Sequence, residues 1–115
     1  YIYNLDNSWN VDFSMIGENN DDYLGSSVAI DGSYAIVGAP NYNESMGKVY
    51  IFKKINYTSW NLDLSHLGQQ QGNYFGYSVD IDSSYVIIGA PNTVNNKGKV
   101  YICRIVINES FKSNK

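Results

Sequence analysis

The chain has 115 residues, of which 43% are hydrophobic, 15% aromatic and 17% charged, and its formal net charge is −3. This composition is typical of one folded domain and excludes a disordered tail. The longest apolar runs span about seven residues, whereas a membrane-spanning helix needs about 20. Runs of this length predict no insertion into a membrane, and because Lys and Arg form no cluster, we expect no nucleic-acid partner.

The N-terminal residues predict two strands. Residues 1–3 are similar to the apolar segment 50–52, which makes them part of a strand. Trp9, Val11 and Phe13 alternate with polar residues, and this period of two predicts a strand with one buried and one solvated face.

Four further strands are predicted over residues 26–30, 34–38, 48–53 and 59–64. The segment 34–38 is apolar without alternation, so it predicts an inner strand that is covered on both faces. A short turn at 31–33 leads into this strand, and Pro40 ends it because proline cannot donate to the ladder. The segment 59–64 alternates as 9–13 does and predicts an outer strand. No helix is expected.

The same pattern returns 51 residues later. Residues 9–53 align with residues 60–104 without a gap, at 23 identities in 45 positions, so the chain contains a tandem duplication. The second inner strand is expected at 85–89. Because both inner strands lack alternation, we expect four residues to be among the most buried of the chain, namely Ile36, Val37, Ile87 and Ile88.

Repeats of about 50 residues with four antiparallel strands each are typical of radially stacked β-propeller blades. The predicted fold is therefore all-β, with tandem four-stranded antiparallel blades. Since propellers have about four to eight blades, the ring is not closed within this chain. Residues 1–13 are assigned to the outer strands of an incomplete blade, 14–64 to the first repeat, and 65–115 to a second repeat that lacks its outer strand.

The repeated motifs resemble a known family. They are Tyr23-Leu24-Gly25 and Tyr74-Phe75-Gly76, Gly38-Ala39-Pro40 and Gly89-Ala90-Pro91, and Gly47-Lys48-Val49 and Gly98-Lys99-Val100. They are similar to the FG-GAP repeats of integrin α-subunit propellers and their extracellular relatives, over nearly the whole chain. Kelch repeats have a similar length but carry paired glycines that are missing here. The resemblance implies an extracellular protein, either secreted or at the cell surface, that binds partners and is not an enzyme.

Calcium and other cofactors are not expected. Many FG-GAP blades hold calcium in an Asp-rich loop before the Gly-Ala-Pro strand, but here that loop keeps one carboxylate, Asp31 or Asp82, where calcium takes about six to eight oxygens. The acidic stretch 18–22 has no acidic counterpart at 69–73 and is interpreted as a solvated loop. No nucleophile, base and carboxylate group together in the pattern to form a catalytic site.

Three N-glycosylation sequons begin at Asn43, Asn56 and Asn108, all in predicted connections between strands. If the chain is secreted by a eukaryotic cell, we expect N-glycans at these positions.

Tyrosine occurs eleven times. Four of these residues recur in register and are interpreted as packing between blades, namely Tyr34, Tyr50, Tyr85 and Tyr101. Three others have no tyrosine one repeat away and are the better candidates for ligand contact, namely Tyr42, Tyr57 and Tyr77.

Two functions remain open at this point. The first is a structural or adhesive protein that assembles with copies of itself through blade faces and strand edges, into a filament or a ring. Trp9, Val11 and Phe13 would then be the assembly strand, because no outer strand is expected after the second repeat. The alternative is a fragment of an integrin-like propeller, completed by further blades of a longer chain, that binds a protein or carbohydrate ligand.

Overall fold

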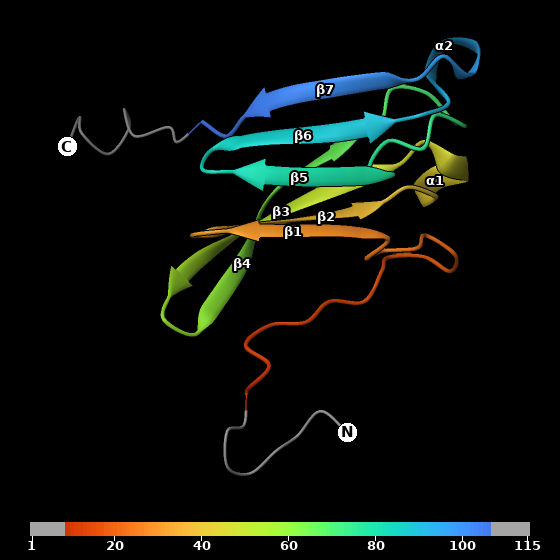
Figure 1. Cartoon of the computed structure of the whole chain (residues 1–115). Helices are drawn as coiled ribbons and strands as arrows, with labels where there is room; N and C mark the ends of the chain where they lie inside the picture. Colours follow the sequence, from red (N-terminus) through yellow and green to blue (C-terminus); the bar gives the residue numbers. More distant parts are fainter. Residues whose placement is uncertain (1–8, 107–115) are drawn as a thin grey trace, which may run out of the picture.

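The structure is a computed structural model that describes residues 9–106 (Figure 1). Predictions that fall on 1–8 and 107–115, including the strand at 1–3 and the sequon at Asn108, lie outside these residues. Within them, α1 (Tyr42–Ser45) and α2 (Thr93–Asn96) are four residues long, and no helix is long and apolar enough to cross a membrane.

Two antiparallel sheets form the molecule, and they confirm the predicted all-β architecture. The first sheet, called blade 1, has the order β1 (Ser27–Asp31), β2 (Tyr34–Ala39), β3 (Lys48–Asn56) and β4 (Ser59–Leu67). The second sheet, called blade 2, has the order β5 (Ser78–Asp82), β6 (Tyr85–Ala90) and β7 (Lys99–Arg104). Within each sheet consecutive strands pair, and the two sheets do not close into a ring (Figure 1).

The β3–β4 hairpin is longer than predicted. The expected strands end at residues 53 and 64, whereas β3 continues to Asn56 and β4 to Leu67. Its two strands pair from Lys48↔Leu67 to Asn56↔Ser59, with two register shifts between these ends. A hairpin turn of two residues keeps the strands close enough to pair along their whole length.

The one-turn helices α1 and α2 contradict the prediction that no helix occurs. They lie at the same position of the two repeats, between the second and third strands. Inside α1, Asn43, Glu44 and Ser45 have φ angles of 53°, 53° and 63°, so the turn is left-handed rather than a regular α-helix. Asn and Gly tolerate such angles better than other residues, and Gly47 closes α1 with a 3.0 Å hydrogen bond to the Tyr42 carbonyl.

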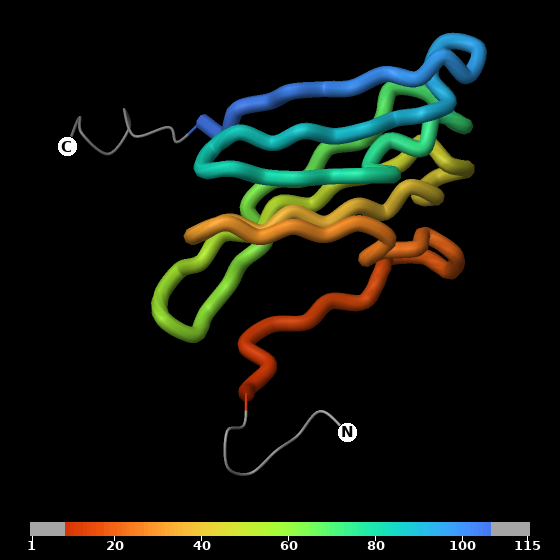
Figure 2. The backbone as a smooth tube through the Cα atoms, viewed as in Figure 1, coloured from red at the N-terminus to blue at the C-terminus, as the bar shows by residue number. Residues whose placement is uncertain are grey.

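The two blades stack face to face, and their contact is the main core of the molecule (Figure 2). We call this contact the seam. Blade 1 contributes Ile36, Val49 and Ile51 to it, and blade 2 contributes Ile81, Val86 and Ile88, all of them buried. At the rim of the seam the Ser27 hydroxyl donates a 2.9 Å hydrogen bond to the Gly76 carbonyl. Backbone and side chains therefore join the two repeats into one packed unit.

Residues 9–15 do not form the predicted strand, because no strand of residues 9–106 pairs with them. They lie against the face of blade 1 that points away from blade 2, and the Phe13 ring is 5.0 Å from the Phe52 ring. Leu64 and Cys103, the counterparts one repeat later, line a common cavity at the seam. Residues 9–15 therefore occupy the same position beside blade 1 that β4 occupies beside blade 2.

Candidate functional site

The face of blade 2 that points away from blade 1 is exposed and apolar. We define this outer face by Tyr85, Ile87, Val100 and Ile102. The equivalent residues of blade 1 are Tyr34, Ile36, Val49 and Ile51, and these are buried in the seam. The exposed fraction rises from 0% at Ile36 to 42% at Ile87, from 1% at Val49 to 60% at Val100, and from 4% at Ile51 to 73% at Ile102.

This difference corrects the predicted burial of the inner strands. Ile36 and Ile88 are buried as expected, whereas Val37 is only half-buried and Ile87 is exposed. Blade 2 covers the face that carries Ile36, but nothing in residues 9–106 covers the face that carries Ile87. Because contiguous exposed apolar residues mark interaction sites, the outer face of blade 2 is a candidate binding surface.

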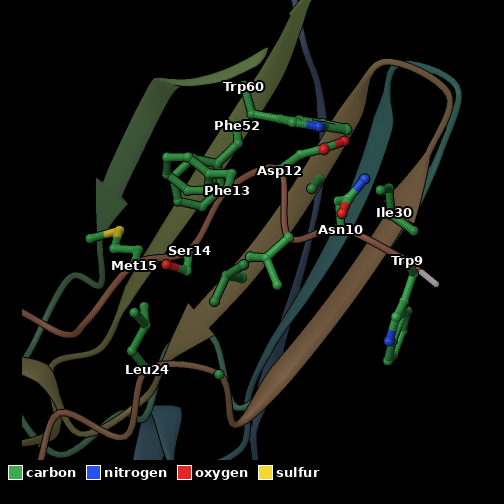
Figure 3. A pocket seen from close by; sticks show the side chains of 14 residues that line it. Trp9, Asn10, Asp12, Phe13, Ser14, Met15, Leu24, Ile30, Phe52 and Trp60 are labelled. Atoms are coloured by element: carbon green, nitrogen blue, oxygen red, sulfur yellow. The ribbon is translucent and has the colours of Figure 1, made fainter. Parts of the chain in front are cut away.

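A second open surface lies on the face of blade 1 that points away from blade 2. We call it the N-terminal cleft, a cavity of 560 Å³ between residues 9–15 and blade 1. Phe13, Phe52 and Trp60 lie side by side at one end of the cleft, and Trp9 lies near Ile30 at the other end (Figure 3). The predicted assembly residues Trp9, Val11 and Phe13 therefore do line one site, although not as a strand.

The cleft corresponds to the seam one repeat earlier. A cavity of 260 Å³ at the seam is lined by β4 and blade 2, and Val49 and Ile51 of β3 close it. In the N-terminal cleft residues 9–15 take the part of β4, but no counterpart of Val49 and Ile51 is present among residues 9–106. Within residues 9–106, the cleft is thus a seam that lacks the third strand of a preceding blade.

A small polar cluster joins the loop before β1 to strand β3. The Lys48 ammonium donates a 2.7 Å hydrogen bond to Glu18 Oε1, and the Tyr50 hydroxyl donates a 2.6 Å hydrogen bond to the same oxygen. The hydrogen bond from Lys48, and then that from Tyr50, lowers the pKa of the Glu18 carboxyl. Hydrogen bonding to Glu18 raises the pKa of Lys48, whereas burial is the largest cause of the raised pKa of Tyr50.

The sequence analysis missed this cluster because it assigned residues 18–22 to a solvated loop. The repeat provides a sequence signal for the cluster, because Gln69, Lys99 and Tyr101 occupy the positions equivalent to those of its three members. The Tyr101 hydroxyl donates a 2.8 Å hydrogen bond to Gln69 Oε1, and Lys99 donates a longer one of 3.4 Å. In both repeats the cluster therefore ties the loop before the first strand of a blade to the third strand of that blade.

The turn at Asp31, where no calcium is expected, has a structural role. Its carboxylate accepts a hydrogen bond from the backbone N–H of Ser83, in the equivalent turn of blade 2. Asp31 thus links the β1–β2 turn to the β5–β6 turn. Among residues 9–106, His, Cys, Asp and Glu side chains form no group of three that can hold a metal ion.

Three of the four recurring tyrosines pack against other side chains, and the fourth is exposed. Tyr34 and Tyr50 are buried, Tyr101 packs edge-on against Phe75 at 5.2 Å between ring centroids, and Tyr85 is exposed on the outer face. The interpretation as packing between blades therefore holds for Tyr34 and Tyr101 at the seam, whereas Tyr50 packs with Phe52 on the side of the N-terminal cleft, and nothing in residues 9–106 covers Tyr85.

The three candidate contact tyrosines lie on different elements. Tyr42 is in α1 with Lys48 Nζ 4.7 Å from its ring centroid, Tyr57 is in the β3–β4 turn and 87% exposed, and Tyr77 precedes β5. Tyr42 and Tyr57 flank opposite ends of β3, so they cannot form one contact site. The sequon residues Asn43 and Asn56 are both exposed.

Comparison with known proteins gives matches in both repeats. The FG-GAP repeat matches residues 17–52 and again residues 68–103. Integrin alpha-M of Mus musculus is 34% identical over 110 residues, which cover 84% of this chain and 9% of that protein. Integrin alpha-X of Homo sapiens is 36% identical over 96 residues, which cover 72% of this chain and 8% of that protein.

The chain therefore spans less than a tenth of the length of these two relatives. The FG-GAP matches begin in the loops that carry Glu18 and Gln69 and end in β3 and β7, so each contains the first three strands of a blade. Together they cover more than half of the chain. The protein accordingly belongs to the FG-GAP repeat family, with repeats of the kind found in integrin α-subunits.

Proposed function

We propose that this protein supplies two consecutive blades of a non-catalytic propeller that acts in adhesion outside the cell or at its surface. The observation that carries the proposal is the exposure of Ile87, Val100 and Ile102 at positions whose counterparts in blade 1 are buried. Leaving such a face in water forgoes about 25 cal/mol for each Å² of apolar surface. The proposed function therefore requires a further blade on this face.

The seam indicates which kind of surface can cover the outer face of blade 2. Blade 2 covers blade 1 with the face that carries Val79, Ile81, Val86 and Ile88. The same face of blade 1, with Ile30 and Val37, lines the N-terminal cleft. The two open surfaces of the chain are thus the two halves of a seam, and each fits the opposite face of another FG-GAP blade.

The finer proposal concerns the source of that blade. Within residues 9–106, β7 pairs only with β6, whereas β3, its counterpart, pairs on both edges. Residues 9–15 of another copy can therefore take the place of β4 on β7, while the outer face of blade 2 enters the N-terminal cleft of that copy. Repetition of this head-to-tail contact gives a ring if the rotation closes and a filament if it does not.

The mass of the particle in solution, measured by light scattering after size-exclusion chromatography, tests this proposal. We expect the wild-type chain to associate, and Ile102→Asp to abolish association because it places a charge on the outer face. Ile55→Asp is the matched control, because Ile55 is 53% exposed near the end of the β3–β4 hairpin and outside both open surfaces. A wild-type monomer at high concentration excludes assembly from copies.

A tandem fusion of two chains tests the more general claim that a further blade covers the outer face. In the fusion, the outer face of the first copy can meet the N-terminal cleft of the second. Backbone amides of β6 and β7 in the first copy are then expected to exchange more slowly with solvent than in the single chain. Equal exchange rates in the two proteins contradict the proposed blade contact.

Recognition of a protein or carbohydrate ligand is the second candidate function. It is supported by a polar hollow of 620 Å³ at the end of blade 1 that carries α1. The hollow is lined by amide and carboxylate side chains and by Tyr42, and side chains of these kinds suit the hydroxyl groups and flat faces of sugars. Tyr42→Ala is expected to weaken binding on a glycan or protein array, and Tyr57→Ala to leave it unchanged.

A further inference from the structure

We propose that Asn56 is an N-glycosylation site and that Asn43 is not, although each begins a sequon. Asn56 is the last residue of β3, and the two-residue turn Tyr57-Thr58 follows it. Asn56, Tyr57 and Thr58 are all exposed, and Tyr57 reaches 87%. The whole Asn56 sequon therefore stands at the tip of a hairpin, where a transferase and a bulky glycan both have room.

The local geometry at Asn56 favours modification. The backbone N–H of Thr58 donates a 3.1 Å hydrogen bond to Asn56 Oδ1, which folds the sequon into an Asx turn. This bond holds the side-chain amide on the side of the turn that carries Thr58. The amide nitrogen Nδ2 makes no hydrogen bond with residues 9–106, so it is available to react.

Asn43 is also exposed, but its side-chain amide and the rest of its sequon make contacts with neighbouring residues. Its Nδ2 lies 3.6 Å from the sulfur of Met46, and its Oδ1 accepts a 3.4 Å hydrogen bond from Gln71. The next two residues of its sequon are tied to the loop that enters blade 2. The Glu44 carbonyl accepts from Gly72 at 3.1 Å, and the Ser45 carbonyl accepts from Tyr74 at 2.8 Å. A glycan at Asn43 would compete with these contacts between the blades.

The position of Asn56 is compatible with the proposed function, on which this inference rests for its extracellular setting. The β3–β4 turn lies at the end of blade 1 opposite α1 (Figure 1). Residues 55–59 line neither the N-terminal cleft nor the cavity at the seam. A glycan at Asn56 thus leaves the cleft and the outer face of blade 2 free for further blades.

The modification is a glycosyl transfer from a lipid-linked oligosaccharide, catalysed by an oligosaccharyltransferase. The Nδ2 atom of Asn56 attacks C1 of the first sugar, and an N–C bond forms while the bond from C1 to the diphosphate oxygen breaks. The polyprenyl diphosphate leaves with the electron pair of that bond. The amide nitrogen gives up one proton to a base of the transferase, and no oxidant or reductant is needed.

The test is site-resolved occupancy of the full chain directed into the secretory pathway of a eukaryotic cell line. Glycoprotein from the medium and from microsomes is digested and treated with peptide:N-glycosidase in ¹⁸O-labelled water, which marks each formerly modified Asn as labelled Asp. Mass spectrometry then reads Asn43 and Asn56 on separate peptides. We expect occupancy at Asn56 to exceed that at Asn43 by about tenfold or more.

Three variants test the two sequons separately. Thr58→Ala is expected to abolish modification of an unchanged Asn56, Thr58→Ser to retain it, and Asn43→Gln to leave the total glycan mass unchanged. Equal occupancy at Asn43 and Asn56, or none at Asn56 in protein from microsomes, overturns the inference. Failure here is distinguishable from failure of the proposed function, because glycan mapping does not depend on association or on protection of β6 and β7.

Discussion

The Tyr50 hydroxyl donates a hydrogen bond of 2.6 Å to the Glu18 carboxylate, and one repeat later the Tyr101 hydroxyl donates one of 2.8 Å to the Gln69 side chain. Each bond ties the loop before the first strand of a blade to the third strand of that blade. The geometry is kept although one acceptor is charged and the other is not. The tyrosine bond therefore fixes the loop, and the charge of Glu18 adds its pairing with Lys48.

The first prediction concerns the charge of Glu18. Its pKa is lowered in the folded state, so its contribution to stability is present above the unfolded-state pKa of about 4.5 and is lost as the pH falls through the lower folded-state value. Glu18→Gln is expected to cost less than about 1 kcal/mol at pH 7, because the ion pair is partly exposed. Urea unfolding at pH 7 and pH 3 measures this difference.

Gln69→Glu is the matched control for this prediction. It places a carboxylate beside Lys99 and Tyr101, as Glu18 stands beside Lys48 and Tyr50. The variant is expected to gain up to about 1 kcal/mol at pH 7 and to lose that gain on acidification. Identical pH profiles for the wild type and both variants would show that the ion pair adds nothing to the hydroxyl bond.

The second prediction compares two glycines at the same position of the repeat. A Cβ atom at Gly38 would lie 2.1 Å from the Gly76 carbonyl oxygen across the seam, and backbone cannot yield at that distance. At Gly89 it would meet the Ser78 hydroxyl at 2.5 Å, which can rotate away, and otherwise nothing closer than 3.8 Å. Gly38→Ala is expected to cost about 1–3 kcal/mol, and Gly89→Ala clearly less. Chemical denaturation of both variants decides between steric strain at the seam and a general loss of backbone freedom.

The third prediction compares two equivalent positions in the inner strands β2 and β6. Ile36→Ala removes a fully buried side chain and is expected to lower the unfolding free energy by about 2–5 kcal/mol. Ile87→Ala, at a position that is 42% exposed, is expected to cost about 1 kcal/mol in the single chain. Equal costs in urea titrations of the single chain would mean that Ile87 is covered in solution by a contact that the structure does not contain.

Much of the fold was predictable because the hydrophobic period and the 51-residue repeat both act on short segments. The two apolar strands around Ile36 and Ile87 were assigned correctly, but periodicity reports only that both faces of a strand are apolar. It does not report whether the covering blade belongs to the same chain, and for that reason the prediction for Ile87 was wrong. The left-handed turn of α1 was not predicted, because Glu44 and Ser45 obtain their hydrogen-bond partners from residues 72 and 74.

The candidate site was predictable only in part. The alternation of Trp9, Val11 and Phe13 identified three residues that do line one cleft. It also predicted a strand, which requires a pairing partner that residues 9–106 do not provide. Glu18 escaped notice because its role depends on Lys48 and Tyr50, which are about 30 positions away.

The fourth prediction is that stability does not depend on calcium. The turn at Asp31 supplies one carboxylate, and that carboxylate already accepts the Ser83 N–H. The melting temperature is expected to be the same in calcium chloride and in EDTA. Asp31→Ala is expected to lower stability by about 1 kcal/mol through loss of the hydrogen bond, equally in both buffers. A calcium-dependent shift of several degrees in the wild type would reveal a bound ion and refute this prediction.

The fifth prediction separates assembly from folding at two equivalent positions. Phe13 packs on Phe52 in the N-terminal cleft, and Leu64, its counterpart, lies in the cavity at the seam. The double variant Trp9→Ser, Phe13→Ser removes two apolar side chains that the proposed contact with β7 of another copy requires. It is expected to abolish association in analytical ultracentrifugation while amide exchange in β2 and β6 stays slow.

Leu64→Ser is the matched control. It is expected to speed amide exchange in β2 and β6 while association persists, because it weakens the seam within each chain and leaves residues 9–15 unchanged. If the double variant associates as the wild type does, the head-to-tail contact does not use residues 9–15.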